Sequence, residues 1–509
     1  MAGRISELLA HGAVDAVAIG APDRIALTYG ELRILVEETG ATLAGLGLTP
    51  TDRVAIVLPN GPAMATSFLS VASWMAAAPL NPAYKAEEFE FYLNDLGARL
   101  LIVADGVATP AREAAQKLDI QIVELVENAS DPAGMFTFKA CPEVGTPASP
   151  QSDDTALVLH TSGTTSRPKI VPLSQKNLAA SARNIAHSLH LTPEDKGLNI
   201  MPLFHIHGLI AVVIAPLSVG SSVTCTTGFN ALKFFNWLAN ENPSWYSGVP
   251  TMHQAILSRA TRNPDVISRA NLRFVRSSSA SLPPQVMAEL EETFGCPVIE
   301  AYGMTEAAHQ MACNPLPPAA RKAGTVGIAA GPEIRLMDTV GQFTPPGGIG
   351  EIVIRGENVT AGYENNPEAN AENFPDDPDG GGRWFRTGDQ GQLDADGYLS
   401  ITGRLKEIIN RGGEKISPRE VDEVLLDHPA VAQVVTFAIP HPKLGEDVAA
   451  AVVLADEAEA DERDIRDFVA ERLAKFKVPA KILILDEIPK GATGKLQRIG
   501  LAEKLGLIS

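Results

Sequence analysis

Short, continuously apolar runs alternate with helix-like segments from the start of the chain. The runs 53-RVAIVLP-59 and 99-RLLIVAD-105 predict buried strands, and 63-AMATSFLSVASWMAAA-78 between them predicts a helix. Strands that are apolar on both faces are typical of parallel sheets that helices cover on both sides. The alternation therefore predicts an α/β fold with a largely buried sheet.

The length of the chain predicts more than one domain. It has 509 residues, which exceeds what a single core usually serves. The composition changes near Gly403, after a hairpin-like segment with an Asp-Gly turn at 392–404. We therefore expect a large N-terminal domain over 1–404 and a small α+β domain over 405–509.

Charge and cysteine content exclude several classes of partner. The net charge of −19 argues against nucleic acid and anionic membranes, and requires that an anionic substrate be held by local positive charge. The four cysteines show no zinc spacing, so a reducing, cytoplasmic location is expected. Neither a secretory signal nor an apolar run long enough to span a membrane is evident.

The stretch 160-HTSGTTSRPKI-170 has the composition of a phosphate-binding loop. It lies between a predicted strand at 155–160 and a predicted helix at 173–191. The candidate ligands of phosphate are Thr161, Ser162, Gly163, Thr164, Thr165 and Lys169. A strand–loop–helix order would place them at the carboxyl end of a sheet strand, where ligands bind in α/β folds. By composition alone, a solvated turn is an equally good interpretation.

A helix start is predicted in the small domain. In 417-SPREVDEVLLDHPAV-431, Ser417 is the expected N-cap, Pro418 occupies the first position and Glu420 completes a capping box.

Four further motifs follow the hydroxyl-rich stretch in order. They are 302-YGMTE-306, 386-RTGD-389, 401-ITGRLKEIINRGGEKISP-418 and 489-PKGATGKLQR-498. With them, essentially the whole chain resembles the adenylate-forming superfamily of acyl-CoA synthetases, luciferases and peptide-synthetase adenylation domains. The resemblance implies a large N-terminal domain of two α/β sheet subdomains plus a small β-barrel, and a mobile C-terminal domain.

The resemblance also implies the reaction and its cofactors, which are ATP, Mg²⁺ and coenzyme A. A carboxylate attacks the α-phosphate of ATP to give an acyl-adenylate and pyrophosphate, and the CoA thiol then displaces AMP. Within this scheme Lys495 would neutralise charge at the reacting atoms, Glu306 would bind Mg²⁺ and Thr305 would contact phosphate. The remaining nucleotide contacts would come from Glu300, Ala301, Tyr302, Asp389 and Arg404. Each role has a structural alternative. Lys495 is a surface lysine, Glu306 is an acid at a helix N-terminus and Tyr302 is a core residue in these alternatives, and Asp389 and Arg404 form a surface ion pair.

Two segments are expected to serve the second step. Lys406 falls where the family has its hinge, and Gly412, Gly413 and Glu414 would border the pantetheine of CoA. The alternatives are that Lys406 is an ordinary linker lysine and that Gly412 and Gly413 form a plain turn. The chain has Ser166 and Ile170 where the family usually has glycine, so pyrophosphate handling is expected to differ in detail.

The segments that wall the acyl pocket in the family are unusually polar here. The candidate acyl contacts are His205, which is also a catalytic candidate, and His207, Arg276, Ser279 and His309. An apolar acid would leave such groups unpaired, whereas a second carboxylate would pair with Arg276. Within the superfamily these segments look most like the oxalyl-CoA synthetase branch, which activates oxalate.

Several alternatives stay open at this level. In one set of hypotheses, the carboxylic acid that the enzyme activates is malonate, a medium-chain fatty acid or an aromatic carboxylate. In another, the chain is a non-catalytic nucleotide-binding protein, or an adenylation domain that serves a carrier protein. The expected partners are a small carboxylate, ATP and CoA, with no nucleic acid and no membrane span.

Overall fold

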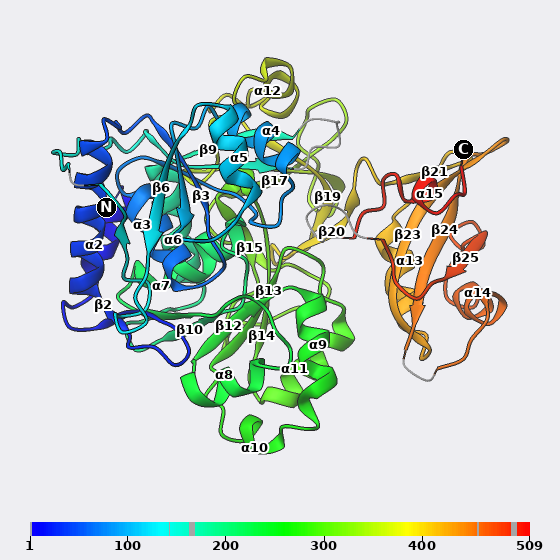
Figure 1. Cartoon of the computed structure of the whole chain (residues 1–509). Coiled ribbons are helices and arrows are strands. Elements are labelled where there is room, and N and C mark those ends of the chain that lie inside the picture. The colour runs from blue at the N-terminus through cyan, green and yellow to red at the C-terminus, as the bar shows by residue number, and fades with distance from the viewer. Residues whose placement is uncertain (1–2, 142, 162–167, 456–457, 490–495, 509) are drawn as a thin grey trace. The chain divides into compact units, whose positions relative to one another are not determined.

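The computed structural model describes residues 3–141, 143–161, 168–455, 458–489 and 496–508 (Figure 1). The chain divides into two compact units. Unit 1 comprises Met1–Ile334, Ile354–Phe385 and Gly397–Leu399, and unit 2 comprises Arg335–Val353, Arg386–Asp396 and Ser400–Ser509. The predicted multidomain α/β class is confirmed.

A seven-stranded sheet occupies the first part of unit 1. Its inner strands pair in parallel, and an antiparallel strand closes each edge. Side by side, its strands are β7 (Thr137–Phe138), β6 (Gln121–Val126), β5 (Leu100–Ala104), β3 (Arg53–Val57), β4 (Ala76–Pro79), β8 (Thr155–Thr161) and β9 (Lys169–Ser174). The apolar runs that predicted β3 and β5 are buried on both faces of this sheet.

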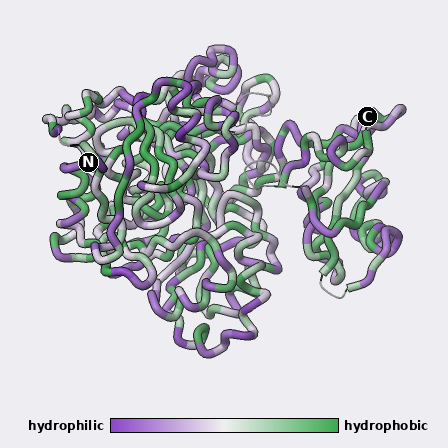
Figure 2. The backbone as a smooth tube through the Cα atoms, viewed as in Figure 1, coloured by the Kyte–Doolittle hydropathy of each residue, from purple (hydrophilic) through white to green (hydrophobic). Residues whose placement is uncertain are grey.

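A nine-stranded sheet completes the framework of unit 1. Its strands from β14 to β1 pair in parallel, and the others are antiparallel. The order is β16 (Ile328–Ala329), β15 (His309–Cys313), β14 (Val298–Met304), β13 (Phe274–Ser278), β12 (Trp245–Gly248), β10 (Lys196–Asn199), β11 (Ser222–Cys225), β1 (Val17–Gly20) and β2 (Leu27–Thr28). Figure 2 shows mostly hydrophobic runs where the strands of unit 1 lie.

Helices connect and cover these strands. They are α1 (Ile5–Leu8), η1 (Leu9–His11), α2 (Tyr29–Gly45), α3 (Pro62–Ala72), α4 (Ala86–Leu96), α5 (Pro110–Lys117), α6 (Gln175–Ser188), the π-helix η2 (His207–Ile214), α7 (Ala215–Leu217), α8 (Phe234–Glu241), α9 (Pro250–Ala260), α10 (Pro264–Ile267), α11 (Pro284–Phe294), η3 (Thr305–Ala307) and α12 (Pro367–Asn373). Helix α2 begins at a full capping box of Thr28 and Glu31. No helix in the described part of the chain is both long and apolar enough to cross a bilayer.

The helix predicted at 63–78 is too long. Helix α3 ends at Ala72, and Ala76–Pro79 forms the buried strand β4 between β3 and β8. Alanine has the highest intrinsic helix propensity, so local preference gave the wrong answer there. Pairing with two neighbouring strands outweighs that preference.

The two described ends of the hydroxyl-rich motif lie in antiparallel strands, which corrects the expected strand–loop–helix order. β9 follows the motif and pairs antiparallel with β8, so that Thr161 lies opposite Lys169. Helix α6 begins only after β9, where Ser174 caps it. Ile170 and Val171 are buried in β9, and such β-branched residues fit a pleated strand better than a helix.

Unit 2 contains the C-terminal residues. A four-stranded sheet, most of whose residues belong to unit 2, has β17 (Glu333–Met337), β18 (Ile349–Arg355), β19 (Phe385–Leu393) and β20 (Leu399–Arg404) in this order. A second sheet has the order β22 (Glu414–Ile416), β21 (Ile409–Arg411), β24 (Gly445–Leu454) and β23 (Val431–His441), with β25 (Lys481–Ile484) also pairing β24. Its helices are α13 (Pro418–Leu426), α14 (Glu462–Ala470) and α15 (Leu501–Lys504).

The capping box predicted for α13 is wrong. Ser417 does stand at the N-cap, but its side chain makes no cap hydrogen bond and donates instead to the carbonyl of Thr402. Glu420 pairs with Lys477 rather than turning back to the helix start. Both side chains have partners far along the chain, which a local motif does not reveal.

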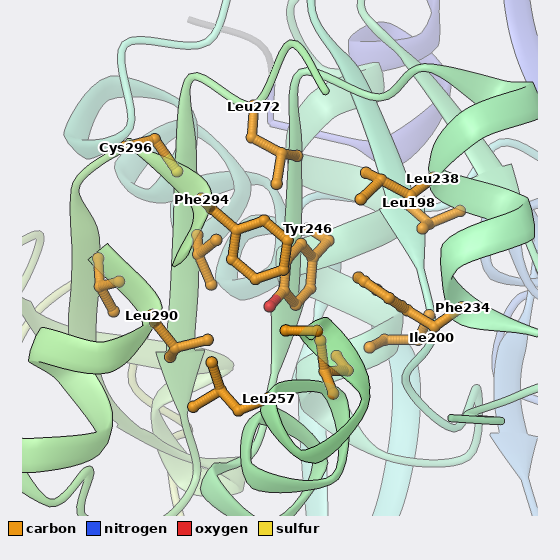
Figure 3. Close-up of a cluster of buried hydrophobic side chains, with 14 of the residues drawn as sticks. Leu198, Ile200, Phe234, Leu238, Tyr246, Leu257, Leu272, Leu290, Phe294 and Cys296 are labelled. Atoms are coloured by element: carbon orange, nitrogen blue, oxygen red, sulfur yellow. The ribbon is translucent and has the colours of Figure 1, made fainter. Parts of the chain in front are cut away.

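A buried hydrophobic cluster packs against one face of the nine-stranded sheet (Figure 3). Tyr246 of β12 lies within it, and its hydroxyl group is 3.3 Å from Nδ1 of His253 on α9. Burial lowers the pKa of His253 from 6.5 to about 4, so the ring is neutral in the folded protein at pH 7. The unfolded chain, in contrast, takes up that proton below pH ~6.5.

His253 is therefore expected to make unit 1 less stable in acid. Because the folded-state pKa is depressed, stability is lost as the pH falls from ~6.5 towards 4, by about 2 kcal/mol at pH 5. The difference between the thermal unfolding midpoints at pH 7.5 and pH 5, measured by calorimetry, should be smaller in His253→Gln. An equal difference in the variant and the wild type would contradict this assignment.

Candidate active site

The β8–β9 hairpin fixes the two ends of the predicted phosphate loop. Thr161 and Lys169 are paired across the hairpin, and Ser162, Gly163, Thr164 and Thr165 lie outside the described residues. The Nζ atom of Lys169 lies 4.3 Å from the ring centroid of Tyr363. The sequence thus located a loop whose described ends meet in neighbouring strands.

The motif 302-YGMTE-306 ends strand β14 and forms the short helix η3. A side chain at Gly303 would place its Cβ 2.0 Å from the carbonyl oxygen of His309, so the bulge between β14 and β15 requires glycine. Glu306 follows in η3 with only 6% of its surface exposed. Its Oε1 accepts a hydrogen bond of 3.0 Å from the hydroxyl group of Tyr363.

The other predicted nucleotide contacts in β14 are buried. Tyr302 is 8% exposed, and the carbonyl of Ala301 accepts a hydrogen bond of 2.8 Å from Ser278. Oε1 of Glu300 accepts one of 2.9 Å from the backbone N–H of Leu282. These contacts anchor the strand, and the roles towards a nucleotide stay predictions.

A buried polar cluster lies in unit 1, and it contains four of the five predicted acyl contacts. Its members are His207, Ser247, Arg276, Ser279, His309 and Gln310. Nη1 of Arg276 is 3.3 Å from Nε2 of His207, and Nη2 donates to Gln310 at 3.2 Å. The remaining predicted contact, His205, lies two residues before His207. Its ring packs against that of Phe204, with the ring centroids 4.6 Å apart.

Strand alternation explains why this cluster is polar. Tyr246 and Val275 are paired neighbours in β12 and β13, and both belong to the apolar cluster of Figure 3. The next pair, Ser247 and Arg276, therefore faces the other side of the sheet. The sheet therefore packs against the hydrophobic cluster with one face and contributes side chains to the polar cluster from the other.

Arg276 carries a charge that no described acid neutralises. It is 0% exposed, and within the described ranges no carboxylate forms an ion pair with it. Its Nε has no hydrogen-bond partner among the described residues. Burial lowers the pKa of the guanidinium to about 10, which leaves it protonated at neutral pH. An uncompensated buried cation is costly, so the arrangement suits an anionic ligand.

The hydrogen bonds of His207 fix its tautomer. Nε2 of His207 lies 2.7 Å from Oγ of Ser247 and 3.3 Å from Nη1 of Arg276. Because an arginine N–H can only donate, Nε2 accepts and the ring proton is on Nδ1. Nδ1 then donates to Oγ of Ser279 at 3.0 Å. Ser279 is only half-buried, and its own hydroxyl hydrogen can point to a ligand. A polar chain therefore runs from Ser279 through His207 to Arg276.

The backbone around this cluster is strained. Ser279 has a φ angle of 72°, Ala308 one of 47° and His309 one of 102°, which are conformations that residues other than glycine rarely adopt. The His309 ring lies 4.9 Å from that of His207. Such strain persists only where the surroundings enforce it, and it gathers at binding and catalytic sites.

Thr305 is half-buried at the start of η3 in unit 1, and unit 2 holds the other predicted site residues. Asp389 and Arg404 form an ion pair of 3.0 Å between their side chains. Gly412 and Gly413 have φ angles of 60° and 96° and make the two-residue turn between β21 and β22, with Glu414 exposed at its end. Lys406 is exposed between β20 and β21. Lys495 lies outside the described residues.

Three residues of the site escaped sequence reasoning. Ser247 and Gln310 complete the hydrogen bonds of Arg276, and Tyr363 contacts both Glu306 and Lys169. Ser247 stands in the otherwise apolar or aromatic run 245-WYSG-248, which is a weak signal of a polar contact on one face of the strand. Tyr363 gave no such signal, because its partners are distant in the sequence.

The described residues offer little for a resident metal ion. They contain no group of three or more His, Cys, Asp or Glu side chains that could hold one. A single carboxylate such as Glu306 suits Mg²⁺ that arrives on a nucleotide, because such Mg²⁺ takes one or two protein oxygens and fills its other positions with phosphate and water.

Comparison with known proteins gives matches over almost the entire chain. The AMP-binding enzyme family matches residues 8–364, and the AMP-binding enzyme C-terminal domain matches residues 420–495. The oxalate–CoA ligase of Arabidopsis thaliana is 45% identical over 96% of both chains, and that of Saccharomyces cerevisiae is 42% identical over 89% of this chain and 86% of the relative. The crystal structure of ATP-bound MatB from Rhodopseudomonas palustris superposes with a TM-score of 0.89 at 28% identity and covers 99% of both chains.

Removal of the unpaired charge should stabilise unit 1. Arg276→Met is expected to raise its thermal unfolding midpoint by about 2 °C, since an apolar side chain suits the site better than an unmatched cation. Arg273→Met is the matched control, because this nearby arginine is paired with Asp195 at 3.0 Å and its loss should lower the midpoint. If calorimetry shows that both variants lower the thermal unfolding midpoint by the same amount, the fold itself compensates the charge of Arg276.

Proposed function

The chain belongs to the AMP-binding enzyme family, and from this premise we propose that it activates oxalate and joins it to coenzyme A. The enzyme is an acid–thiol ligase that makes acyl-CoA through an acyl-adenylate. The observation that carries the choice of acid is Arg276, a buried guanidinium without a described carboxylate partner.

A small dicarboxylate matches this cluster in charge. Oxalate keeps one carboxylate while the other reacts, and the second charge stays close to the reacting carbon. The hydroxyl group of Ser279, whose oxygen accepts from His207, would hydrogen-bond the retained carboxylate, and Arg276 behind them would supply the opposite charge. An apolar acid would desolvate these groups without pairing them. The oxalate–CoA ligases of Arabidopsis and yeast, at 45% and 42% identity, support the same choice.

The first step needs positioning and charge stabilisation. A carboxylate oxygen forms a bond to the α-phosphorus of ATP, and the bond to the bridging oxygen of the β-phosphate breaks, so that pyrophosphate leaves. Residues 161–169 would hold the departing phosphates, and Lys495 would stabilise the charge that builds up at the α-phosphate. Mg²⁺ held by Glu306, with Thr305 beside it, would neutralise phosphate charge when bound.

The remaining predicted residues would bind the nucleoside and complete the second step. Asp389 would accept hydrogen bonds from the ribose hydroxyls, with Arg404 paired to it, and Glu300, Ala301 and Tyr302 would border the adenine. The thiol of CoA then attacks the acyl carbon, and AMP leaves with the electron pair of the broken C–O bond. Lys406, Gly412, Gly413 and Glu414 would act in this step.

A panel of acids tests the proposal. With ATP, Mg²⁺ and CoA, the highest kcat/KM is expected for oxalate, followed by malonate, with hexanoate and coumarate turned over poorly. The enzyme should also catalyse pyrophosphate exchange that depends on oxalate, which a non-catalytic nucleotide-binding protein would not do. Transfer to free CoA would exclude an obligate carrier partner. A clear preference for hexanoate or coumarate would refute the assignment.

Arg276→Leu should reduce kcat/KM for oxalate by about 100-fold, because a buried charge pair with the substrate is lost. Arg273→Leu, which removes a nearby arginine with its own acid partner, should leave the value within about threefold of wild type. Unchanged oxalate turnover in Arg276→Leu would show that Arg276 does not recognise the acid, even if oxalate is the substrate.

Lys495 is expected to act in adenylate formation. Lys495→Ala should lower oxalate-dependent pyrophosphate exchange by about 100-fold or more, since a preorganised charge at the reacting phosphate is removed. Conversion of supplied oxalyl-adenylate to oxalyl-CoA should fall much less. Equal losses in the two half-reactions would contradict a role in the first step alone.

A further inference from the structure

We propose that Gln310 is a specificity-determining residue, whose neutral amide holds Arg276 in place without cancelling its charge. The guanidinium charge then remains available to the second carboxylate of the acid. This role rests on the proposed function, because it concerns how the same cluster distinguishes an acid with a second negative charge from an acid without one.

Gln310 lies near the start of β15 and is 0% exposed. Its Oε1 accepts a hydrogen bond of 3.2 Å from Nη2 of Arg276 on β13. Strand β14 lies between β13 and β15, so this contact joins two strands that are not neighbours in the sheet. The backbone carbonyl of Gln310 accepts a further bond of 3.1 Å from the side-chain amide of Asn358, which fixes the strand at this point.

The surroundings of Gln310 decide which end of its amide faces Arg276. Nε2 of Gln310 lies 3.4 Å from the carbonyl oxygen of Ala330, which can only accept. Nε2 also donates to Oγ of Ser188 at 3.1 Å. The hydroxyl hydrogen of Ser188 is in turn donated to the carbonyl of Asn184 at 2.8 Å. The amide nitrogen therefore belongs on this side, and the amide oxygen is left for Arg276.

A glutamine meets both requirements of this position, whereas a glutamate would meet only one. A carboxylate would also accept from Arg276, but it would cancel the charge and turn its other oxygen towards the carbonyl of Ala330. His207 and Ser247, the other acceptors of Arg276, are neutral as well. Burial raises the pKa of Cys313, also on β15, to about 11, so its thiol stays neutral near the guanidinium.

The charge of Arg276 acts in a buried site, where the low dielectric makes its attraction for an anion stronger than in water. Glyoxylate has the two-carbon skeleton of oxalate, but an aldehyde group replaces one carboxylate. The two acids therefore differ in charge and little in size. The ratio of kcat/KM for oxalate to kcat/KM for glyoxylate reports how much uncancelled positive charge the site contains.

The test measures this ratio in the full chain at saturating ATP, Mg²⁺ and CoA. In Gln310→Glu the ratio should fall by about 100-fold, because the new carboxylate takes the partner of the substrate's second carboxylate. In Gln310→Met, which is neutral and of similar size, it should fall by only about fivefold, because one neutral hydrogen bond to Arg276 is lost. Both values come from the same preparation, so the ratio does not depend on how much of a variant folds.

Gln175 provides a matched control for a buried acid elsewhere in unit 1. It is also 0% exposed, and its Oε1 accepts from the backbone N–H of Ile5 at 3.1 Å. Its Nε2 donates to the carbonyl of Ala72 at 2.6 Å. The amide is thus held between a donor and a carbonyl, as in Gln310, but its donor is an uncharged backbone group. Gln175→Glu should lower the thermal unfolding midpoint and leave the ratio of oxalate to glyoxylate unchanged.

A double-mutant cycle without substrate tests the cancellation of charge itself. Arg276→Met is expected to raise the thermal unfolding midpoint of the wild type. In the Gln310→Glu background the same substitution should lower the midpoint, because the buried carboxylate then loses its partner. If Arg276→Met has the same effect in both backgrounds, the two side chains are not electrostatically coupled and the inference is wrong.

The outcomes separate this inference from the choice of acid. An unchanged ratio in Gln310→Glu, or an equal fall in Gln310→Met or in Gln175→Glu, would overturn the inference even if oxalate is the substrate. If malonate is instead the best acid, and the ratio of malonate to propionate falls in Gln310→Glu alone, the inference stands and the choice of oxalate is wrong.

Discussion

The candidate site depends on one buried cation that the described fold leaves without a carboxylate. Arg276 lies in an inner parallel strand, where a side chain has almost no access to water. Its donors reach a histidine, a serine and a glutamine, which are neutral acceptors. A protein keeps such a costly arrangement where a ligand supplies the missing charge, and this is the physical basis for proposing a small dicarboxylate as the substrate.

The chain's strongly negative charge makes this local cation more important. With a net charge of −19, the protein as a whole repels a dianion such as oxalate. Attraction of the proposed substrate would therefore have to come from groups at short range, and a low-dielectric interior strengthens such interactions. Strain at Ser279 and His309 belongs to the same arrangement, because their unusual backbone angles occur where the polar cluster meets the turn that carries Glu306.

Sequence patterns predicted the parallel strands well because these strands are apolar on both faces, as β3 and β5 are. They failed where long-range pairing outweighs local preference. The alanines of β4 favour a helix but form a strand between two others, and Ser417 has the residue type of a cap but bonds to Thr402 instead. The strand β9 was missed for the same reason, because its antiparallel partner β8 decides its conformation.

The order of motifs by itself determined the family, the two-step chemistry and most of the candidate residues, because those motifs are local. Only the tertiary structure decided which residues act together. It placed Ser247 and Gln310 around Arg276, and it brought Tyr363 against Glu306 although 57 positions separate them. The physical reason is that a hydrogen bond or an unmatched charge depends on distance in space. The sequence does not contain that distance until the sheets have formed.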